Sequence, residues 1–314
     1  MRLATISKNG DERLVSLLDG ERMLDLAAAD SAESGVSDPS FASMLAFIAA
    51  GEAPMERARA LIEDPHNDAV LLAKDVRFLA PISQPPQIRD CLVFEEHLKN
   101  SFAQAEKMTG RPFAIPDVWY EQPIYYKANR FSVIGHEQNV EWPSFSQHMD
   151  FECELAVVVG QSGKNIPVDR AADHIFGYTI FNDMTARDAQ MREMAGQLGP
   201  AKGKDFDTGN VLGPCIVTAD EIEMDADGRI SLDMEARVNG KRWGGGNASA
   251  MHHTFGAILA HISASETLHT GEIIGSGTVG TGCGLELGKQ LSDGDVIELE
   301  IERIGTLRNR IVKG

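Results

Sequence analysis

Residues 150–160, DFECELAVVVG, place two glutamates directly before an apolar run that ends in glycine. Val-rich runs of this length are typical of strands in a buried sheet. Because side chains alternate between the faces of a strand, Glu152 and Glu154 point the same way, roughly 7 Å apart. Two like charges beside a core are costly to desolvate unless a partner neutralises them. One such partner is a divalent cation. The alternative is that the strand lies at the edge of the sheet and its polar face is in contact with solvent.

A second apolar run, FGYTIFND at residues 176–183, ends in Asp183. With Glu152 and Glu154 it brings the number of carboxylates that flank predicted strands to three. Hard oxygen ligands favour Mg²⁺, Mn²⁺ or Ca²⁺ over Zn²⁺. We therefore predict a Mg²⁺ site on Glu152, Glu154 and Asp183, with Mn²⁺ or Ca²⁺ as the alternatives.

Basic and polar side chains follow these carboxylates along the chain. Arg187 and Gln190 lie three residues apart in MTARDAQ, residues 184–190. A helix is expected to begin there, so the two side chains share one of its faces. Lys204 belongs to KGKDFDTGN, residues 202–210. A lysine in such a loop is usually solvated, but Lys204 can also reach the carboxylate of a substrate.

Composition narrows the classes of function. The chain has 314 residues, 43% of them hydrophobic, and a net charge of −18. This acidity argues against nucleic acids and anionic membrane surfaces as partners, and an anionic substrate would need a local positive site. The four cysteines form no C-x-x-C pair, which argues against a zinc motif or a disulfide framework and favours the cytoplasm. Neither a signal peptide nor a membrane span is expected.

Two domains are expected. Residues 1–85 form a small N-terminal α/β domain that begins with a β-hairpin turned at Asn9-Gly10. Residues 86–314 are rich in short Val/Ile strands and Gly turns, which indicates a β-rich α+β domain. The proline-rich segment at residues 81–86 marks the boundary, because clustered prolines resist regular structure.

At these motifs the chain resembles the fumarylacetoacetate hydrolase superfamily. The family patterns D-x-E-x-E-L-A-V-V and N-D-x-T-A-R-D-x-Q are both present, and K-x-F-D-T precedes G-P. Five matching segments occur in order, at residues 150–158, 182–190, 204–214, 275–282 and 293–309. The resemblance covers residues 86–314. It implies a catalytic domain built on a rolled mixed β-sheet, and a homodimer.

The resemblance also implies a general base. His97 matches the family histidine that activates water from a lid segment. Asn100 stands where the family has a glutamate partner for that histidine, which leaves Glu95, Glu96 and Glu106 as alternative partners. Without a carboxylate partner, His97 would be a weaker and less firmly oriented base.

The remaining site residues follow from the same resemblance. His97 and Lys204 are the implied catalytic groups. The residues implied to bind the substrate are Tyr126, Lys127, Arg187, Gln190 and Thr278. The substrate that the resemblance implies is a small anionic 2-oxo or 2,4-diketo acid.

The implied reaction is Mg²⁺-dependent hydrolysis of a C–C bond in a 2,4-diketo acid of the acylpyruvate, fumarylpyruvate or fumarylacetoacetate type, as in aromatic compound catabolism. The metal stabilises the enolate that forms when the bond breaks. Without attack by water, the same chemistry gives decarboxylation of an oxaloacetate-type acid or isomerisation of a 2-hydroxy-dienoate. The alternative from another class is a metal- and anion-binding protein without catalytic activity.

Overall fold

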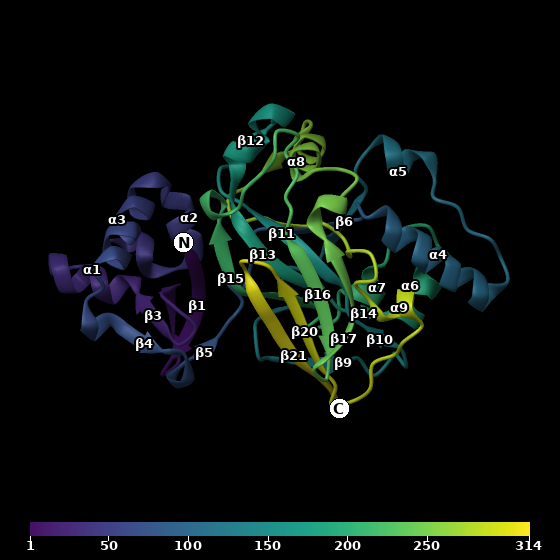
Figure 1. The fold of residues 1–314 in the computed structure, drawn as a ribbon, viewed down its shortest axis with the longest axis horizontal. Coiled ribbons are helices and arrows are strands. Elements are labelled where there is room, and N and C mark those ends of the chain that lie inside the picture. The colour runs from purple at the N-terminus through teal and green to yellow at the C-terminus, as the bar shows by residue number, and fades with distance from the viewer.

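The computed structural model describes residues 1–314, except for the side chain of residue 108. A lobe formed by the N-terminal strands and helices lies at one side of the molecule, and helices α4 and α5 lie at the opposite side of the central strands (Figure 1). The predicted class, a β-rich α+β fold with mixed sheets, is confirmed. The extents of the two domains stay a prediction.

The structure is built mainly from β-strands. In chain order they are β1 (Arg2–Lys8), β2 (Asp11–Leu17), β3 (Arg22–Asp25), β4 (Val70–Leu72), β5 (Arg77–Phe78), β6 (Ile88–Cys91), β7 (Tyr125–Ala128), β8 (Val133–Ile134), β9 (Asn139–Trp142), β10 (Met149–Asp150), β11 (Cys153–Val159), β12 (Gly163–Lys164), β13 (Ile175–Asp183), β14 (Thr185–Ala186), β15 (Asn210–Thr218), β16 (Asp233–Val238), β17 (Lys241–Asn247), β18 (Thr267–Leu268), β19 (Ile273–Gly275), β20 (Val296–Ile301) and β21 (Gly305–Lys313).

The α-helices are mostly short. In chain order they are α1 (Leu26–Ser34), α2 (Met44–Ala50), α3 (Glu52–Glu63), α4 (Glu95–Thr109), α5 (Asp117–Glu121), α6 (Arg187–Met194), α7 (Ala201–Lys204), α8 (Phe255–Ser263) and α9 (Gly284–Leu287).

The N-terminal hairpin forms as predicted. Asn9 and Gly10 both have positive φ, 56° and 95°, which is the backbone that a tight hairpin turn requires and that Asn-Gly adopts readily. Strand β1 also pairs with β15 on its other edge. The sheet order is therefore β4-β3-β2-β1-β15-β13-β11-β19-β6-β7, so strand pairing continues across the predicted boundary near residues 81–86.

The centre of this sheet carries the predicted apolar strands. Every residue of β11, β13 and β15 is buried, which explains why their sequences are almost continuously apolar rather than alternating. Full burial of one Val or Leu side chain contributes roughly 1.5–3 kcal/mol to stability. These strands therefore give a rigid base for polar groups at their ends.

A second sheet packs against the first. Its order is β17-β16-β20-β21-β9, and β16 and β20 contact β11 and β13 respectively. The main hydrophobic core lies between the two sheets, and a second core lies under the N-terminal helices. This packing leaves the ends of β6, β11 and β13 as the place where polar side chains converge.

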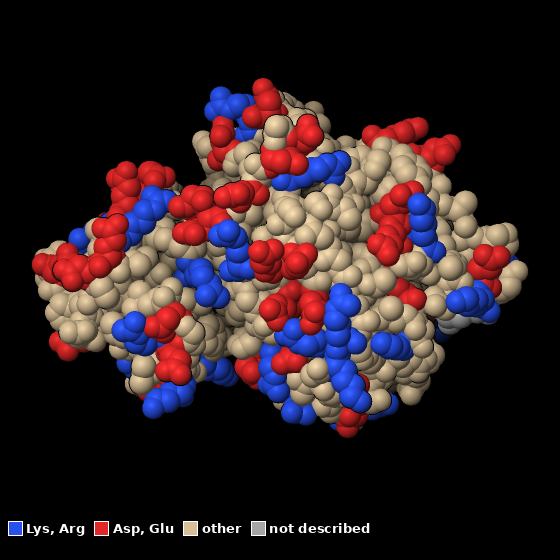
Figure 2. Space-filling view, in the orientation of Figure 1, with Lys and Arg blue, Asp and Glu red and all other residues tan. Residues whose placement is uncertain are grey.

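Charge is spread over the surface. On the face drawn in Figure 2, acidic and basic side chains are interspersed, so the net charge of −18 is not gathered into one patch there. Among the described residues, none of the helices is long and apolar enough to cross a membrane.

Candidate active site

Three buried carboxylates meet at the end of the central strands. Asp90 on β6, Glu154 on β11 and Asp183 on β13 each offer one oxygen, and these oxygens all lie within 4.8 Å of one another. Strand register explains the convergence. Gly275 of β19 pairs with Asp90 on one side and with Ala156 of β11 on the other, while Glu154 pairs with Phe181 of β13.

Each of these carboxylates has an oxygen without a partner. Oδ1 of Asp90, Oε1 of Glu154 and Oδ1 of Asp183 are buried and accept no hydrogen bond in the described part of the chain. An unsatisfied buried polar atom costs roughly 1–3 kcal/mol, and more when it is charged. Three such atoms in one cluster are a set that a bound cation would satisfy.

The backbone of the β19 segment makes room for the cluster. A Cβ at Gly275 would lie 2.5 Å from Oδ1 of Asp90 and 2.7 Å from Oε2 of Glu154, closer than real contacts allow. The N–H of Gly277 donates to Oε2 of Glu154 at 3.0 Å. The segment at residues 275–282 thus leaves space for Asp90 and Glu154 at Gly275 and binds Glu154 through Gly277.

Two cationic side chains close the other side of the cluster. Lys204, which is 3% exposed, donates to Oε2 of Glu152 at 2.5 Å and also to Oδ2 of Asp183. Nη1 of Arg187 lies 2.7 Å from Oε1 of Glu152. Glu152 is therefore held between two cations and beside Asp183, whereas Glu154 groups with Asp90.

Asp150 fixes the orientation of Arg187. Its Oδ2 accepts from Nε of Arg187 at 2.8 Å, and its oxygens also accept the backbone N–H groups of Gly284 and Leu285. Nη1 of Arg187 donates to Oε1 of Gln190 at 3.1 Å, so these two residues share one helix face, as predicted. Asp150 thereby ties the start of α6 to the start of α9.

Burial and neighbouring charges separate the pKa values of the carboxyl groups. Burial raises the pKa of Asp90 to about 6 and that of Asp183 to about 8, and it raises the pKa of Glu154 well above its usual value. Burial also opposes ionisation of Glu152, but Lys204 and Arg187 outweigh it and lower its pKa.

The residues fit a hard divalent cation. Every converging donor is a carboxylate oxygen, the set that Mg²⁺ and Mn²⁺ prefer. The unpartnered oxygens belong to Asp90, Glu154 and Asp183, while Lys204 already links Glu152 to Asp183. A cation here would bind Asp90, Glu154 and Asp183, with Glu152 adjacent.

Metal-free protein is expected to lose stability as the pH rises from about 4 to about 8. The pKa values of Asp90 and Asp183 rise from 3.8 to about 6 and about 8 on folding. The folded chain then binds more protons than the unfolded chain, and stability falls as those protons leave. Bound metal should remove this decline. Thermal melting from about pH 5 to about pH 8, with and without Mg²⁺, tests this expectation; a flat metal-free profile would contradict it.

A histidine and a glutamate form a second polar group beside the cluster. Nδ1 of His97 lies 2.8 Å from Oε1 of Glu286, and both side chains are buried. Oε2 of Glu286 accepts from Nδ2 of Asn100 at 3.0 Å and from the N–H of Thr281 at 2.7 Å. Helix α4 supplies His97 and Asn100, and the short α9 supplies Glu286. His97 therefore has a glutamate partner, Glu286, and Asn100 helps to orient that glutamate.

Glu286 is a site residue that the sequence analysis missed. Of the proposed substitutes, Glu95 binds Lys99 and Tyr120 instead, and the side chain of Glu96 lies against Gly280. The only local signal is a single acidic residue in GLEL, residues 284–287. Its pairing with His97, 189 positions away, is visible only after folding.

The structure brings most of the predicted site residues together, but not Lys127. Tyr126 donates to Oδ2 of Asp183 at 2.6 Å, and Thr278 is buried next to Gly277. Lys127 instead points to the opposite side of β7, where it is half-exposed and binds Glu266 at 3.1 Å. Adjacent residues of a strand face opposite ways, so Tyr126 and Lys127 cannot both face the cluster.

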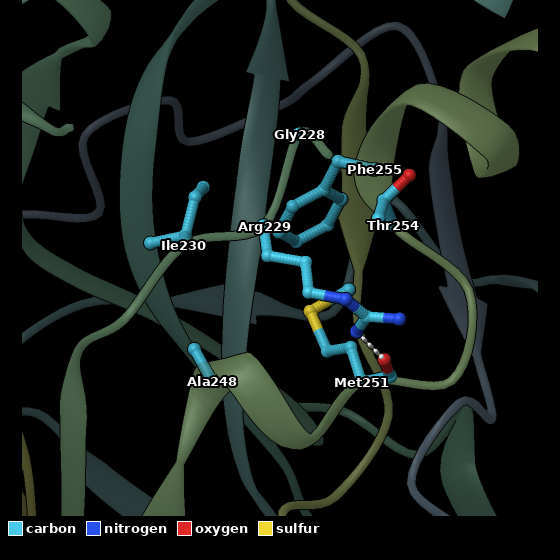
Figure 3. A pocket seen from close by; sticks show the side chains of 7 residues that line it. All are labelled: Gly228, Arg229, Ile230, Ala248, Met251, Thr254 and Phe255. Atoms are coloured by element: carbon cyan, nitrogen blue, oxygen red, sulfur yellow. Dashed lines mark hydrogen bonds between the residues drawn. The ribbon is translucent and has the colours of Figure 1, made fainter. Parts of the chain in front are cut away.

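A small cavity is lined by residues that belong neither to the carboxylate cluster nor to the pair of His97 and Glu286. It is lined by Gly228, Arg229, Ile230, Ala248, Met251, Thr254 and Phe255 (Figure 3). Nη1 of Arg229 donates to the carbonyl of Met251 at 2.6 Å. Its volume of about 10 Å³ is about the space that one water molecule needs, so it is no substrate site.

The sequence model described as "Fumarylacetoacetate (FAA) hydrolase C-terminal" matches residues 91–312. The chain therefore belongs to the fumarylacetoacetate hydrolase family, whose members are enzymes that act on small acids. The predicted resemblance is confirmed.

Individual relatives differ in reaction. The oxaloacetate tautomerase YisK of Bacillus subtilis is 33% identical over 303 residues, which are 94% of each chain. A fumarylacetoacetate hydrolase from the psychrophilic Exiguobacterium antarcticum has a TM-score of 0.76 and 27% identity, with 100% of both chains covered. A maleylpyruvate hydrolase from Sphingobium sp. SYK-6, solved with manganese(II) and pyruvate, has a TM-score of 0.74 and 23% identity over 100% of both chains. At that identity the last likeness shows the fold alone.

Proposed function

We propose that this chain is a metal-dependent enzyme that interconverts the keto and enol forms of a small 2-oxo diacid of the oxaloacetate type. One observation carries the proposal: the buried pair of His97 and Glu286 stands beside a carboxylate cluster flanked by Lys204 and Arg187. The full-length similarity to an oxaloacetate tautomerase supports the choice of reaction.

The cation is proposed to be Mg²⁺, with Mn²⁺ or Ca²⁺ as alternatives. Asp90, Glu154 and Asp183 would hold it, with Glu152 as the fourth candidate ligand. When bound, such a metal polarises the keto oxygen of a 2-oxo acid and makes the neighbouring C–H bonds more acidic.

His97 would move the proton. Oε2 of Glu286 already accepts two N–H donors, and its Oε1, which also faces Sγ of Cys283, can accept from Nδ1 of His97. Nδ1 then carries the proton, which leaves Nε2 as the acceptor. Nε2 would take the proton from C3 of the substrate, and the C–H electron pair would form the C2–C3 double bond. Return of that proton to the keto oxygen gives the enol, with no atom lost.

Lys204 and Arg187 would stabilise the negative charge that develops on the substrate oxygens. Both are buried and ionic, and fixed charges act most strongly where water is excluded. Tyr126, Gln190 and Thr278 remain proposed substrate contacts. Lys127 is left out of this set, because it binds Glu266 on the other side of the strand.

Hydrolysis of a C–C bond in a 2,4-diketo acid is the second candidate. The carboxylate that orients His97 favours it, because a water molecule must be deprotonated to attack a carbonyl. In that reaction Nε2 of His97 would take its proton from water. The substrate would be of the acylpyruvate type, as in the breakdown of aromatic compounds.

Parallel assays separate the two candidates. Metal-loaded protein is mixed with enolic oxaloacetate, acetylpyruvate or fumarylpyruvate, and the loss of enol absorbance and the release of pyruvate are followed. The proposal expects rapid oxaloacetate tautomerisation and slower cleavage. Faster cleavage of a diketo acid would favour hydrolysis, and inactivity on all three substrates would contradict both candidates.

Substituting Arg187 with lysine is expected to raise KM by about tenfold or more, with a smaller change in kcat. Lysine keeps the charge but lacks the planar fork that spans Asp150 and Glu152. One lost charge-assisted hydrogen bond corresponds to roughly 1.5–3 kcal/mol, and about 1.4 kcal/mol is a tenfold change in affinity. Steady-state kinetics with oxaloacetate checks the value. An unchanged KM would remove Arg187 from the substrate contacts.

We also propose a homodimer in the cytoplasm. The dimer is supported by the family resemblance and by two exposed apolar side chains, Met194 and Leu198, which are 54% and 97% exposed. Exposed apolar side chains often gather at an interface. The cytoplasm is supported by the four cysteines, all of which are free. Light scattering that gives the mass of a single chain would contradict the dimer.

A further inference from the structure

We propose that His97, Cys283 and Glu286 form a second cation site, one that takes Zn²⁺ in preference to Mg²⁺. The three residues are buried, and one ligand atom from each lies within 4.8 Å of the others. This site is separate from the carboxylate cluster and has a different donor set. Its binding of metal does not depend on which reaction the protein catalyses.

The spacing of the donors suits a small tetrahedral ion. Sγ of Cys283 lies 3.4 Å from Oε1 of Glu286, and Nδ1 of His97 lies 2.8 Å from the same oxygen. Zinc binds sulfur at about 2.3 Å and nitrogen or oxygen at about 2.0–2.2 Å, so its ligands stand roughly 3.4 Å apart. Small side-chain movements would therefore give three zinc ligands, with a fourth position left for water.

Donor chemistry separates the two sites. One sulfur, one nitrogen and one oxygen form a mixed set that favours zinc, whereas the oxygen-only set of Asp90, Glu154 and Asp183 favours Mg²⁺ or Mn²⁺. Excess Mg²⁺ should therefore fill the carboxylate cluster and leave the second site free for zinc. The site left no sign in the sequence, because it has one cysteine and its other two ligands, His97 and Glu286, are 189 positions apart.

Local packing holds the three donors in place. Helices α4 and α9 contact each other. Cys283 is the residue directly before α9, and its backbone pairs with Glu152 in an isolated bridge. Asp150 accepts the first N–H groups of α9, and Asn100 holds the second oxygen of Glu286.

Zinc binding would remove the proton acceptor from the reaction. Coordination displaces the S–H proton of Cys283, which passes to water, and the proton on Nδ1 of His97, which moves to Nε2 through water; sulfur and Nδ1 then bond to zinc. His97 and Glu286 would then be ligands and no longer a free base pair. Inhibition by zinc, unlike zinc binding, rests on the role proposed above for His97.

Cobalt(II) is the probe that tests the site, because a thiolate bound to cobalt gives a strong near-ultraviolet charge-transfer band and carboxylates do not. The full chain is saturated with Mg²⁺ and titrated with Co²⁺, then with Zn²⁺. We expect a thiolate band that saturates at one Co²⁺ per chain and that Zn²⁺ abolishes. Turnover in the same samples should fall as the cobalt band rises, and it should stay low when Zn²⁺ replaces Co²⁺.

Two cysteine variants make the test specific. Cys283→Ser keeps a donor to Glu286 but should abolish the band and weaken zinc binding by at least about tenfold. Cys215→Ser is the matched control, because Cys215 is also buried and its Sγ lies 3.5 Å from a carbonyl oxygen; it should keep the band. Melting curves establish that both variants fold.

The proposal is overturned if the wild-type chain shows no band, or if Cys283→Ser keeps the band and the zinc affinity. Zinc binding that Cys283→Ser leaves unchanged would mean a site elsewhere in the molecule. A normal cobalt band together with full turnover would support the metal site but contradict the role of His97 as the base.

Discussion

Replacing Asp183 with asparagine is expected to lower turnover by about 10³-fold or more. Asp183 contributes one of the three converging oxygens and also binds Lys204 and Tyr126. A metal acting on a keto oxygen supplies several kcal/mol of transition-state stabilisation, and each 1.36 kcal/mol is about a tenfold change in rate. Turnover and metal binding should be lost together.

The fold of Asp183→Asn should survive, because the change removes one of several like charges from a buried cluster. Asp205→Asn is the control: Asp205 follows Lys204 directly, but its carboxylate binds the N–H of Asn129 at 2.8 Å. This variant should keep its metal and nearly normal turnover. Full turnover of Asp183→Asn after chelation and return of Mg²⁺ would show that the cluster is not the metal site.

Loss of the His97 side chain is expected to lower turnover by about 10²-fold or more, which is the usual effect of a positioned general base. Glu286→Gln should also lower it, by at least about tenfold. The amide of glutamine can donate to Nδ1 and so favour the tautomer in which Nε2 already carries the proton. Asn100→Ala removes only one of the hydrogen bonds to Glu286 and should cost less. Rate constants and pH profiles of the three variants check this order.

Comparing substrates sharpens the test of His97. If His97 serves both proposed reactions, His97→Ala slows oxaloacetate tautomerisation and acylpyruvate cleavage alike. A variant that cleaves acylpyruvate slowly but tautomerises oxaloacetate at the wild-type rate would assign His97 to water activation alone. Wild-type rates on both substrates would exclude His97 as the base.

Local patterns were enough to predict the central strands and the side-by-side placement of Glu154 and Asp183. The Val-rich run at residues 155–159 is a strand because every position is buried, and Asn9-Gly10 gives the hairpin its turn. Glu154 lies in β11 and Asp183 lies in β13, and these two strands pair antiparallel, which brings the two carboxylates together. Pairing between neighbouring strands is the kind of contact that sequence patterns capture.

Contacts between distant segments were not predictable in the same way. Asp90 joins the cluster because β6 pairs in parallel with β19, which places it opposite Gly275. The only signal was a single aspartate between Arg89 and the apolar run at residues 91–94. Glu286 meets His97 because α9 packs against α4, and no local feature of either segment encodes that contact.

The placement of Lys127 could have been predicted from the sequence. Tyr126 and Lys127 are neighbours in β7, so period-2 alternation already required them to face opposite sides. The partners confirm it: Tyr126 binds Asp183, and Lys127 binds Glu266 at the surface. Glu152 and Glu154 share a face by the same rule, yet Lys204 and Arg187 bind Glu152 while Glu154 groups with Asp90.

A titration with Mn²⁺ tests the central claim most directly, because free Mn²⁺ is counted by electron paramagnetic resonance while oxaloacetate turnover is measured in the same samples. Chelated protein is the starting point, and Asp183→Asn is run beside the wild type. The account predicts that turnover rises in proportion to bound Mn²⁺ and saturates at one ion per chain, and that Asp183→Asn neither binds nor turns over. Full turnover in chelated wild-type protein with no Mn²⁺ bound would contradict it.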